Sequence, residues 1–312
     1  MSGKNVTEVV QADAAGIARA ARILESGGLV AVPTETVYGL AARADNAAAV
    51  AKIYAAKGRP GFNPLIVHVN GAEQADQFAV LSDEVRSLMA RYWPGPLTLV
   101  LPCRADAELA PAVTAGLPTV ALRAPAHPVM RALLGQIDFP LAAPSANRSG
   151  FISPTTPDHV LASLDGRIDL VLDGGACEAG LESTIIALRE DGRIDELRPG
   201  PLHLAGQEAG NRAGARIEAP GQMASHYAPG KPVRLGALEA GPDEFLIGFG
   251  EVAGDVTLSS GGDLAEAAAR LYTCLHEAAR AGKPRIAVAP VPVEGIGRAI
   301  NDRLRRAAMP AD

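Results

Sequence analysis

Residues 57–68, KGRPGFNPLIVH, place Lys57, Arg59, Asn63 and His68 in one short stretch that also holds two prolines and two glycines. A lysine ammonium is a compact positive charge that suits phosphate, and an arginine guanidinium is a planar fork for phosphate or carboxylate. Glycine lets backbone N–H groups approach oxygen atoms closely. The stretch therefore predicts a turn that binds an anion.

Similar residues recur where the chain leaves other apolar runs. Arg123 ends one such run, Ser145 and Asn147 lie in the loop PSANRSG, and Ser183 and Arg198 begin and end a predicted hairpin. Segments that leave a sheet at its edge can direct their side chains into a common cleft. Cations, hydroxyls and amides together suit a polyanion beside a small zwitterion.

Each of these residues also has a purely structural interpretation. A Lys-x-Arg pair after a helix is commonly a solvated C-terminus that the helix dipole favours. His68 in an apolar run is more often a core histidine than a ligand, and Arg123 is also a candidate for a structural ion pair. The residues alone indicate an anion-binding α/β protein and do not identify the anion.

Apolar runs of strand length alternate with helix-like stretches over most of the chain. Asn46 is typical of a helix N-cap and Gly58 of a helix end, which places Lys57 on the last turn of a helix. An Asp-Gly turn within 183–200 predicts a β-hairpin. The mixture predicts an α/β fold with a twisted, mixed sheet flanked by helices. The expected strands are 28–33, 64–69, 96–102, 119–125 and 169–175, and the expected helices are 46–58, 82–93, 127–135 and 156–164.

A change of composition divides the chain. Residues 205–232 are rich in Gly, Ala and Pro with little periodicity, which is typical of a linker. Beyond it, the segments 244–250, 263–282, 285–291 and 295–308 read as strand, helix, strand and helix. We therefore predict a first domain over 1–204, a linker over 205–232 and a small C-terminal α/β, Rossmann-like domain over 233–312.

The whole-chain composition narrows the class of protein. A net charge of −6 argues against a protein that coats nucleic acid by bulk attraction, so any anion must be held by a local cluster. The three cysteines are far apart, which argues against a disulfide framework or a zinc site. The N-terminal residues lack the apolar core of a signal peptide, and no apolar run approaches the roughly 20 residues of a membrane span. We predict a cytoplasmic protein without a membrane segment and without a protein-held metal.

Several familiar sites are absent from the sequence. It contains no G-x-x-x-x-G-K-[ST] phosphate loop, no G-x-G-x-x-G that opens a helix, no G-x-S-x-G elbow and no H-E-x-x-H pair. A phosphate-bearing ligand must therefore be held by the scattered cations and small residues described above.

Seven motifs follow one another along the chain: VPTETVYGLAA, KGRPGFNPLIVHV, WPGPLTLVL, TVALRAPAHP, APSANRSG, ESTII and LRPG. In this order they resemble the motifs of the threonylcarbamoyl-AMP synthases, the YrdC-like family. The resemblance covers roughly residues 15–204, and the segment SHYAPGKP followed by a small α/β unit resembles the long, two-domain form of that family.

The resemblance implies a nucleotidyltransferase that converts L-threonine, bicarbonate and ATP into threonylcarbamoyl-AMP and pyrophosphate. This is the first step in making threonylcarbamoyladenosine in tRNA, and a separate tRNA threonylcarbamoyl transferase complex uses the product. Mg²⁺ is expected with ATP, held mainly by the phosphates, because no acidic cage stands out in the sequence. A weak contact with tRNA is a further expectation.

The resemblance also assigns roles to residues. Lys57 and Arg59 are implied as the catalytic cations. The implied ATP-binding residues are Arg59, Asn63, Thr119, Ser145, Asn147, Ser153, Arg198 and, from the linker, Tyr227. The implied threonine-binding residues are Thr34, Thr36, His68, Arg123, Ala143 through its backbone, and Ser183. Tyr38 flanks the threonine pocket, and the linker is expected to close over the site.

Two other functions remain as alternatives. One is an RNA-binding module, which the acidic charge and the 4% aromatic content disfavour. The other is a carbamoyltransferase that starts from carbamoyl phosphate, as in hydrogenase maturation, whose zinc-binding cysteine clusters this sequence lacks.

Overall fold

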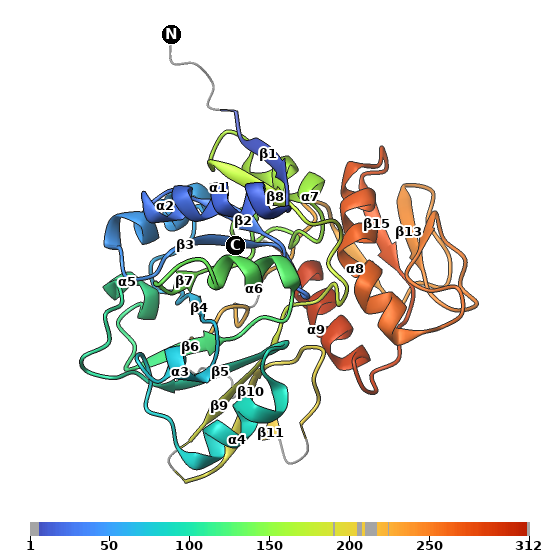
Figure 1. The fold of residues 1–312 in the computed structure, drawn as a ribbon. Coiled ribbons are helices and arrows are strands. Elements are labelled where there is room, and N and C mark those ends of the chain that lie inside the picture. Colours follow the sequence, from blue (N-terminus) through green and yellow to red (C-terminus); the bar gives the residue numbers. More distant parts are fainter. Residues whose placement is uncertain (1–5, 190, 205–207, 210–216, 224, 311–312) are drawn as a thin grey trace.

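The computed structural model describes residues 6–189, 191–204, 208–209, 217–223 and 225–310. Two β-sheets, each with its own helices, lie side by side (Figure 1). The larger sheet takes its strands from residues 8–209 and the smaller from residues 233–288. A mixed α/β fold with a second small α/β unit is thereby confirmed, and the domain boundaries at 204 and 232 stay predictions.

The large sheet is mixed, with strand order β1-β8-β2-β3-β7-β4-β6-β5-β9-β10-β11. Strand β4 pairs with β6 in parallel and with β7 antiparallel, so His68 lies opposite both Arg123 and Leu141. The strands are β1 Glu8–Gln11, β2 Val30–Val32, β3 Gly39–Arg43, β4 Ile66–His68, β5 Leu97–Pro102, β6 Thr119–Arg123, β7 Leu141–Ala142, β8 Leu170–Asp173, β9 Thr184–Leu188, β10 Ile194–Arg198 and β11 Glu208–Ala209.

Five of the seven described helices of the large unit begin after a residue whose side chain caps the helix. Asn46 accepts a hydrogen bond from the Ala49 N–H at 3.0 Å, and Gly58 ends the same helix in the left-handed region at φ 59°. Lys57 is therefore held at a fixed helix end, as predicted. The helices are α1 Ala14–Glu25, α2 Ala47–Lys57, α3 Ala72–Ala75, α4 Asp83–Tyr92, α5 Pro111–Thr114, α6 Pro128–Leu134 and α7 Pro157–Leu164.

The two faces of the large sheet are covered differently. Helix α2 packs on one face through Val50 and Ile53, while α1 and α6 cover part of the other face. The rest of that second face, over β4, β5, β6, β9 and β10, forms a small apolar cluster whose cover is Ala219 of the predicted linker. His68 and Arg123 lie on this second face, between α6 and the linker, and both are buried.

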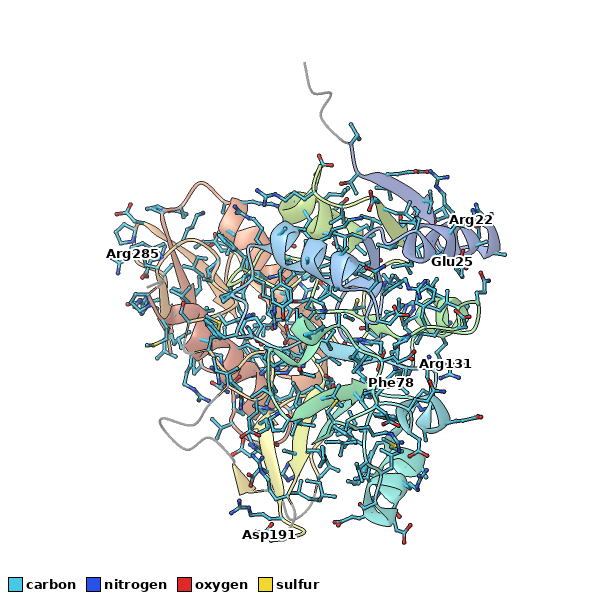
Figure 2. The ribbon with its side chains drawn as sticks, turned by 90° about the vertical axis from the view of Figure 1, so that its left-hand side faces the viewer. Arg22, Glu25, Phe78, Arg131, Asp191 and Arg285 are labelled. Atoms are coloured by element: carbon cyan, nitrogen blue, oxygen red, sulfur yellow. The ribbon has the colours of Figure 1, made fainter. Side chains whose placement is uncertain are left out.

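The β9–β10 hairpin confirms the Asp-Gly turn. Asp191 lies at its tip (Figure 2), its carboxylate accepts the Arg193 N–H at 3.0 Å, and Gly192 has φ 79°. Because L residues with side chains rarely adopt that conformation, glycine is the residue this turn requires.

The small unit is a parallel sheet of order β12-β15-β13-β14 with two helices. Its helices contact the large unit, since Tyr272 and Arg303 both reach Glu182. The sequence predicted the two central strands and both helices but missed the short edge strands β12 and β14. The elements are β12 Val233–Leu235, β13 Glu244–Gly248, β14 Val256–Thr257, α8 Leu264–Arg280, β15 Arg285–Val288 and α9 Gly297–Ala308. Among the described residues, no helix is both long and apolar enough to cross a bilayer.

Candidate active site

A small cavity lies where β4 and β6 end, under the segments 217–223 and 225–227. Its volume is about 40 Å³, which is room for a few water molecules. Residues distant in sequence meet there, since the lining runs from Thr34 to Tyr227. The predicted site residues that line the cavity are Thr34, Thr36, Arg59, His68, Arg123, Ala143, Ser145, Ser183, Arg198 and Tyr227.

Five predicted residues do not line this cavity. Lys57, Asn63, Asn147 and Ser153 are buried in its walls, hydrogen-bonded to groups that do line it or to neighbouring backbone. Thr119 lies at the other end of β6 from Arg123, about 13 Å away at the rise of an extended strand. The two residues share one face of the sheet because they are four positions apart.

Arg123 is anchored by three groups of the protein. Its Nη2 lies 2.6 Å from Glu35 Oε1, its Nη1 donates to Thr36 Oγ1 at 2.9 Å, and its Nε donates to the Gly95 carbonyl at 3.3 Å. A guanidinium carries five N–H donors, so two remain for a ligand. The structural ion pair and a binding role are therefore compatible. Burial opposes the charged form of Glu35, but the charge and hydrogen bonds of Arg123 outweigh it and lower the pKa of that carboxyl.

His68 is buried beside this arginine, and among the described residues no hydrogen-bond partner reaches its Nδ1. Burial, and then the charge of Arg123, lowers the pKa of His68 to about 3. The imidazole is therefore neutral at physiological pH, with one ring nitrogen free to bond a ligand. This is what a small polar substrate next to Arg123 requires.

The histidines predict acid lability. In the folded chain, burial lowers the pKa of His68, His226 and His276 to about 3 and that of His159 to about 4. In the unfolded chain their pKa is near 6.5. Below about pH 6.5 these histidines bind protons in the unfolded state but remain neutral in the folded state. Their contribution to the free energy of unfolding is therefore complete above that pH and is lost toward pH 4. We expect the melting temperature, followed by circular dichroism at constant ionic strength, to fall steadily over this range. A flat profile would contradict the burial of these rings.

Arg59 and Lys57 shape the loops next to the cavity. Arg59 donates to the Asn63 side-chain oxygen at 2.7 Å and to the Pro64 carbonyl at 2.7 Å, and burial lowers the pKa of its guanidinium to about 10. The Lys57 ammonium donates to the backbone carbonyls of Ser145 and Asn147. Burial, and then the charge of Arg59, lowers the pKa of Lys57 well below its usual range. Lys57 thus positions the PSAN loop, and its contact with a substrate stays a prediction.

Replacing Lys57 by alanine is expected to lower stability as well as turnover. The two carbonyls would lose a buried donor, at a cost of about 1–3 kcal/mol each. For a chain of this length that corresponds to a drop in melting temperature of roughly 5 °C or more. Thermal unfolding and turnover of the Lys57→Ala variant, with the exposed Lys283→Ala as control, test this. An unchanged melting temperature would show that the ammonium does not hold the loop.

Ser183 and Arg198 form a second fixed pair. Arg198 donates through Nη2 to the Ser183 carbonyl and to Ser183 Oγ, both at 3.0 Å, and Thr98 Oγ1 lies 2.7 Å from the same hydroxyl. Arg198 also reaches the Pro220 carbonyl at 3.4 Å. This cation therefore joins the ESTII strand to the linker.

The described part of the linker fills the mouth of the cavity. Tyr227 is 1% exposed and has φ 63°, a conformation that costs a bulky residue about 1–2 kcal/mol. A Cβ at Gly221 would lie 2.8 Å from Arg198 Cδ and 3.0 Å from the Tyr227 hydroxyl, so a larger residue does not fit there. Ala228 donates its N–H to the Gly150 carbonyl at 2.8 Å. The described part of the linker lies over the cavity with little space beneath it, and its closure over an active site stays a prediction.

Three residues of the site were missed from the sequence: Glu35, Glu182 and His226. Glu182 and His226 line the cavity, and Glu35 pairs with Arg123 behind it. The available signal was a lone acid within each of the motifs VPTETVYG and ESTII, next to predicted site residues. A carboxylate in a buried motif implies a buried cation as its partner.

Two protein families match the chain. Residues 22–200 match the family described as Telomere recombination, and residues 193–309 match the family described as Threonylcarbamoyl-AMP synthase, C-terminal domain. The threonylcarbamoyl-AMP synthase of Bacillus subtilis (strain 168) is 40% identical over 336 aligned residues, which cover 97% of this chain and 96% of the relative. The chain belongs to the threonylcarbamoyl-AMP synthase family.

Archaeal members of this synthase family extend the likeness to structure. The threonylcarbamoyl-AMP synthase of Pyrococcus abyssi (strain GE5 / Orsay) is 39% identical over 319 residues, 93% of each chain. The crystal structure of P. abyssi Sua5 complexed with L-threonine superposes with a TM-score of 0.87 at 35% identity, covering 97% of each chain. The resemblance found in the sequence is confirmed for both units.

A more distant likeness shows the fold alone. Full-length HypF in the phosphate- and nucleotide-bound form matches with a TM-score of 0.53 at 22% identity, over 61% of this chain and 30% of that one. The synthase family accounts for nearly the whole chain, whereas this likeness does not.

Proposed function

We propose that this cavity, once the linker withdraws, is where the chain carries out the reaction of its family. L-Threonine, bicarbonate and ATP give threonylcarbamoyl-AMP, pyrophosphate and water. The observation that carries the proposal is the convergence of Arg59, Arg123 and Arg198 with the hydroxyls of Ser145 and Ser183 on one cavity. In an acidic chain, such a local cluster of cations supports the binding of anions.

The end of the cavity near β4 and β6 suits threonine. The two free N–H donors of Arg123 would bind its carboxylate, and the neutral His68 and the hydroxyl of Thr36 offer partners for its polar groups. The P. abyssi protein, which shares this fold, was crystallised as a complex with L-threonine. The shared fold supports the same amino acid here.

The other end suits the nucleotide. Arg59 and Asn63 lie at the start of β4 and Thr119 at the start of β6, on the face that the linker covers. Thr119 and Arg123 lie about 13 Å apart on one face of β6, so the nucleotide and the amino acid would bind toward opposite ends of this strand. Ser145, Ser153 and the nearby Arg198 would then contact the phosphates.

The chemistry asks the protein for position and charge rather than for a nucleophile. The threonine amine captures carbon dioxide from bicarbonate to form a carbamate, and a carbamate oxygen attacks the α-phosphorus. The bond from that phosphorus to the bridging oxygen breaks, and pyrophosphate leaves. Fixed cations stabilise the negative charge that builds on the phosphate oxygens, and exclusion of water protects the carbamate and the mixed anhydride.

The donor set does not offer a protein cage for magnesium. Among the described residues, no group of three or more His, Cys, Asp or Glu is placed to hold a metal ion. The cavity carboxylate, Glu182, already accepts from Ser153, Tyr272 and Arg303. Mg²⁺ would therefore arrive on the triphosphate, whose oxygens are its main ligands and whose charge it reduces. The product is a reactive mixed anhydride. A separate tRNA-modifying transferase would use it, and both proteins would act in the cytoplasm.

Pyrophosphate release tests the proposal. With ATP and Mg²⁺ present, we expect release that requires both L-threonine and bicarbonate and that falls to background when either is omitted. Release that instead depends on carbamoyl phosphate would favour the carbamoyltransferase. Binding of tRNA with a steep salt dependence, without any threonine-dependent release, would favour an RNA-binding module.

A further inference from the structure

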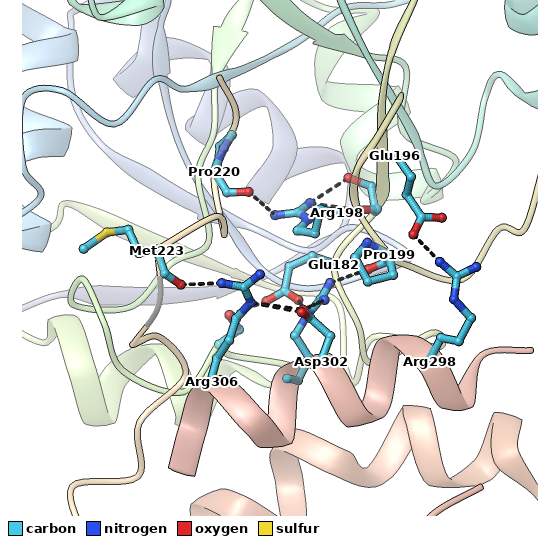
Figure 3. A network of polar contacts seen from close by, with 12 residues as sticks. Glu182, Glu196, Arg198, Pro199, Pro220, Met223, Arg298, Asp302 and Arg306 are labelled. Atoms are coloured by element: carbon cyan, nitrogen blue, oxygen red, sulfur yellow. Dashed lines mark hydrogen bonds and ion pairs between the residues drawn. The ribbon is translucent and has the colours of Figure 1, made fainter. Parts of the chain in front are cut away.

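Arg303 is the largest side chain that the described residues bury completely, with 0% exposure, and it comes from helix α9 of the small unit. Its Nε donates to Glu182 Oε2 at 2.9 Å, and its Nη2 donates to the Pro199 carbonyl at 2.9 Å. Its guanidinium lies 5.3 Å from the ring centroid of Tyr227. One side chain of the small unit thus contacts Glu182, the Pro199 carbonyl and Tyr227, which come from three separate segments of the chain. Figure 3 shows Glu182 and Pro199 next to helix α9.

Glu182 connects Arg303 to Ser153, a residue of the proposed nucleotide site. Its Oε1 accepts the Ser153 hydroxyl at 2.6 Å, and both carboxylate oxygens lie within hydrogen-bond distance of the Tyr272 hydroxyl, at 3.0 and 2.8 Å. Ser153 is completely buried, and the partner of its hydroxyl is this carboxylate. The direction in which its hydroxyl points is therefore set by a carboxylate that Arg303 and Tyr272 hold in place.

Helix α8 also contacts the backbone of Ser153 directly. His276 lies one helical turn after Tyr272, on the same face, and its Nε2 is 3.2 Å from the Ser153 carbonyl. The His276 ring also stacks on His159 of the large unit, with centroids 3.9 Å apart. Both the side chain and the backbone of Ser153 are thus fixed from the small unit.

Another ion pair between the two units lies outside the cavity. Arg298, on the same helix as Arg303, pairs with Glu196, but its side chain is 39% exposed and neither residue lines the cavity (Figure 3). A pair that merely joined the units would resemble this one. The Arg303–Glu182 pair is instead completely buried and reaches the cavity lining.

The Arg123 guanidinium, at the threonine end of the cavity, does not depend on these contacts. It is held by Glu35, Thr36 and Gly95, all from the large unit. The small unit is therefore in a position to affect one substrate and leave the other unaffected.

We propose that Arg303 and Tyr272 are positioning residues of the small unit, which hold Glu182 and, through it and Pro199, fix Ser153 and the Arg198–Pro199 turn in the wall that binds the nucleotide. This deepens the proposed function and rests on it. The small unit thereby completes the ATP-binding wall of a site whose substrate contacts all come from the large unit and the linker. It explains why a cation and a carboxylate are buried together, when an apolar pair would join two units with less desolvation.

The test compares Arg303→Met, which keeps the volume and removes the charge, with Arg298→Met as the matched control on the same helix. Binding of a non-hydrolysable ATP analogue is measured by isothermal titration, and the Michaelis constants for ATP and for L-threonine by pyrophosphate release. We expect Arg303→Met to weaken binding of the analogue and to raise the constant for ATP, each by at least tenfold, with the constant for threonine within twofold. Arg298→Met should stay within twofold of the parent in all three.

Folding of each variant is checked first by thermal unfolding. If Arg303→Met leaves Glu182 uncompensated and does not fold, Arg303→Met/Glu182→Gln removes both charges and is measured in the same way. Arg303→Lys keeps the charge but loses the fork to Pro199, and should raise the constant for ATP by an intermediate factor. An Arg303 variant that behaves like Arg298→Met, or that raises both Michaelis constants by the same factor, overturns the positioning role.

The two proposals fail separately. A parent chain that binds the analogue but releases no threonine-dependent pyrophosphate overturns the proposed function, and analogue binding by the variants still decides the role of Arg303. A parent chain that makes product while the Arg303 variants bind the analogue as tightly as the parent overturns this inference alone.

Discussion

Replacing Arg123 by alanine is expected to raise the Michaelis constant for L-threonine by roughly 30- to 900-fold, the equivalent of about 2–4 kcal/mol for a buried charged contact. The reason is geometric, because Glu35, Thr36 and Gly95 fix the guanidinium and leave two N–H donors for the carboxylate. The constant for ATP should change far less, because the nucleotide end is built from other residues. Initial rates of pyrophosphate release with each substrate varied in turn check this.

The control must separate lost binding from a damaged fold. Without Arg123 the Glu35 carboxylate would remain buried and unpaired, and its pKa, now lowered by the guanidinium, would rise. The Arg123→Ala/Glu35→Gln variant removes that charge, so it should regain stability without regaining affinity for threonine. A double variant that binds threonine as tightly as the parent would show that Arg123 serves only the ion pair.

The elements that carry the site follow from local signals. Asn46 and Gly58 mark both ends of α2, and apolar runs of strand length mark β4 and β6. These signals place Lys57, His68 and Arg123 at the ends of elements, because caps and strand periodicity act within a few residues. The short strands β12 and β14 and the small-residue strand β3 lack that signal, and their pairing comes from neighbours along the sheet.

The convergence of the site depends on contacts that no local pattern contains. Lys57 meets the carbonyl of Asn147, 90 residues later, and Arg303 meets Glu182 across 121 residues. The types of Lys57 and Arg59 suggested phosphate binding, but their actual partners depend on which loops the sheet topology brings close. The motifs indicated which residues matter, and only the fold separates the residues that face the cavity from those that hold its walls.

The linker illustrates the same limit. Its composition predicts a linker without regular periodicity, yet Pro220 accepts a hydrogen bond from the buried Arg198 and Tyr227 is itself buried. The cavity beneath is about 40 Å³, while pockets for ligands of this size commonly hold several hundred cubic ångströms. If both substrates bind in this cavity, as we propose, the linker must withdraw before they enter.

Locking the linker in this position is expected to abolish nucleotide binding. Phe151 and Ala228 are paired across a parallel β-bridge, where Cα atoms lie about 4.8 Å apart, within the range a disulfide spans. The Phe151→Cys/Ala228→Cys variant should, when oxidised, bind a non-hydrolysable ATP analogue at least about 100-fold more weakly than when reduced. Apparent affinity falls in proportion to the fraction of molecules that can open, and the disulfide removes that fraction. Isothermal titration before and after reduction measures the difference.

The single-cysteine variants Phe151→Cys and Ala228→Cys, treated with the same oxidant, control for the substitutions and for oxidation of the three native cysteines, two of which are buried. Reduction should restore binding in the double variant, because Tyr227 in its left-handed conformation makes the closed state less stable than its contacts alone would suggest. Equal affinity in the oxidised and reduced forms would mean that ATP reaches its site with the linker closed. The nucleotide would then have to bind outside the cavity that Arg59, Arg123 and Arg198 share, and the end-to-end arrangement of the two substrates would be wrong.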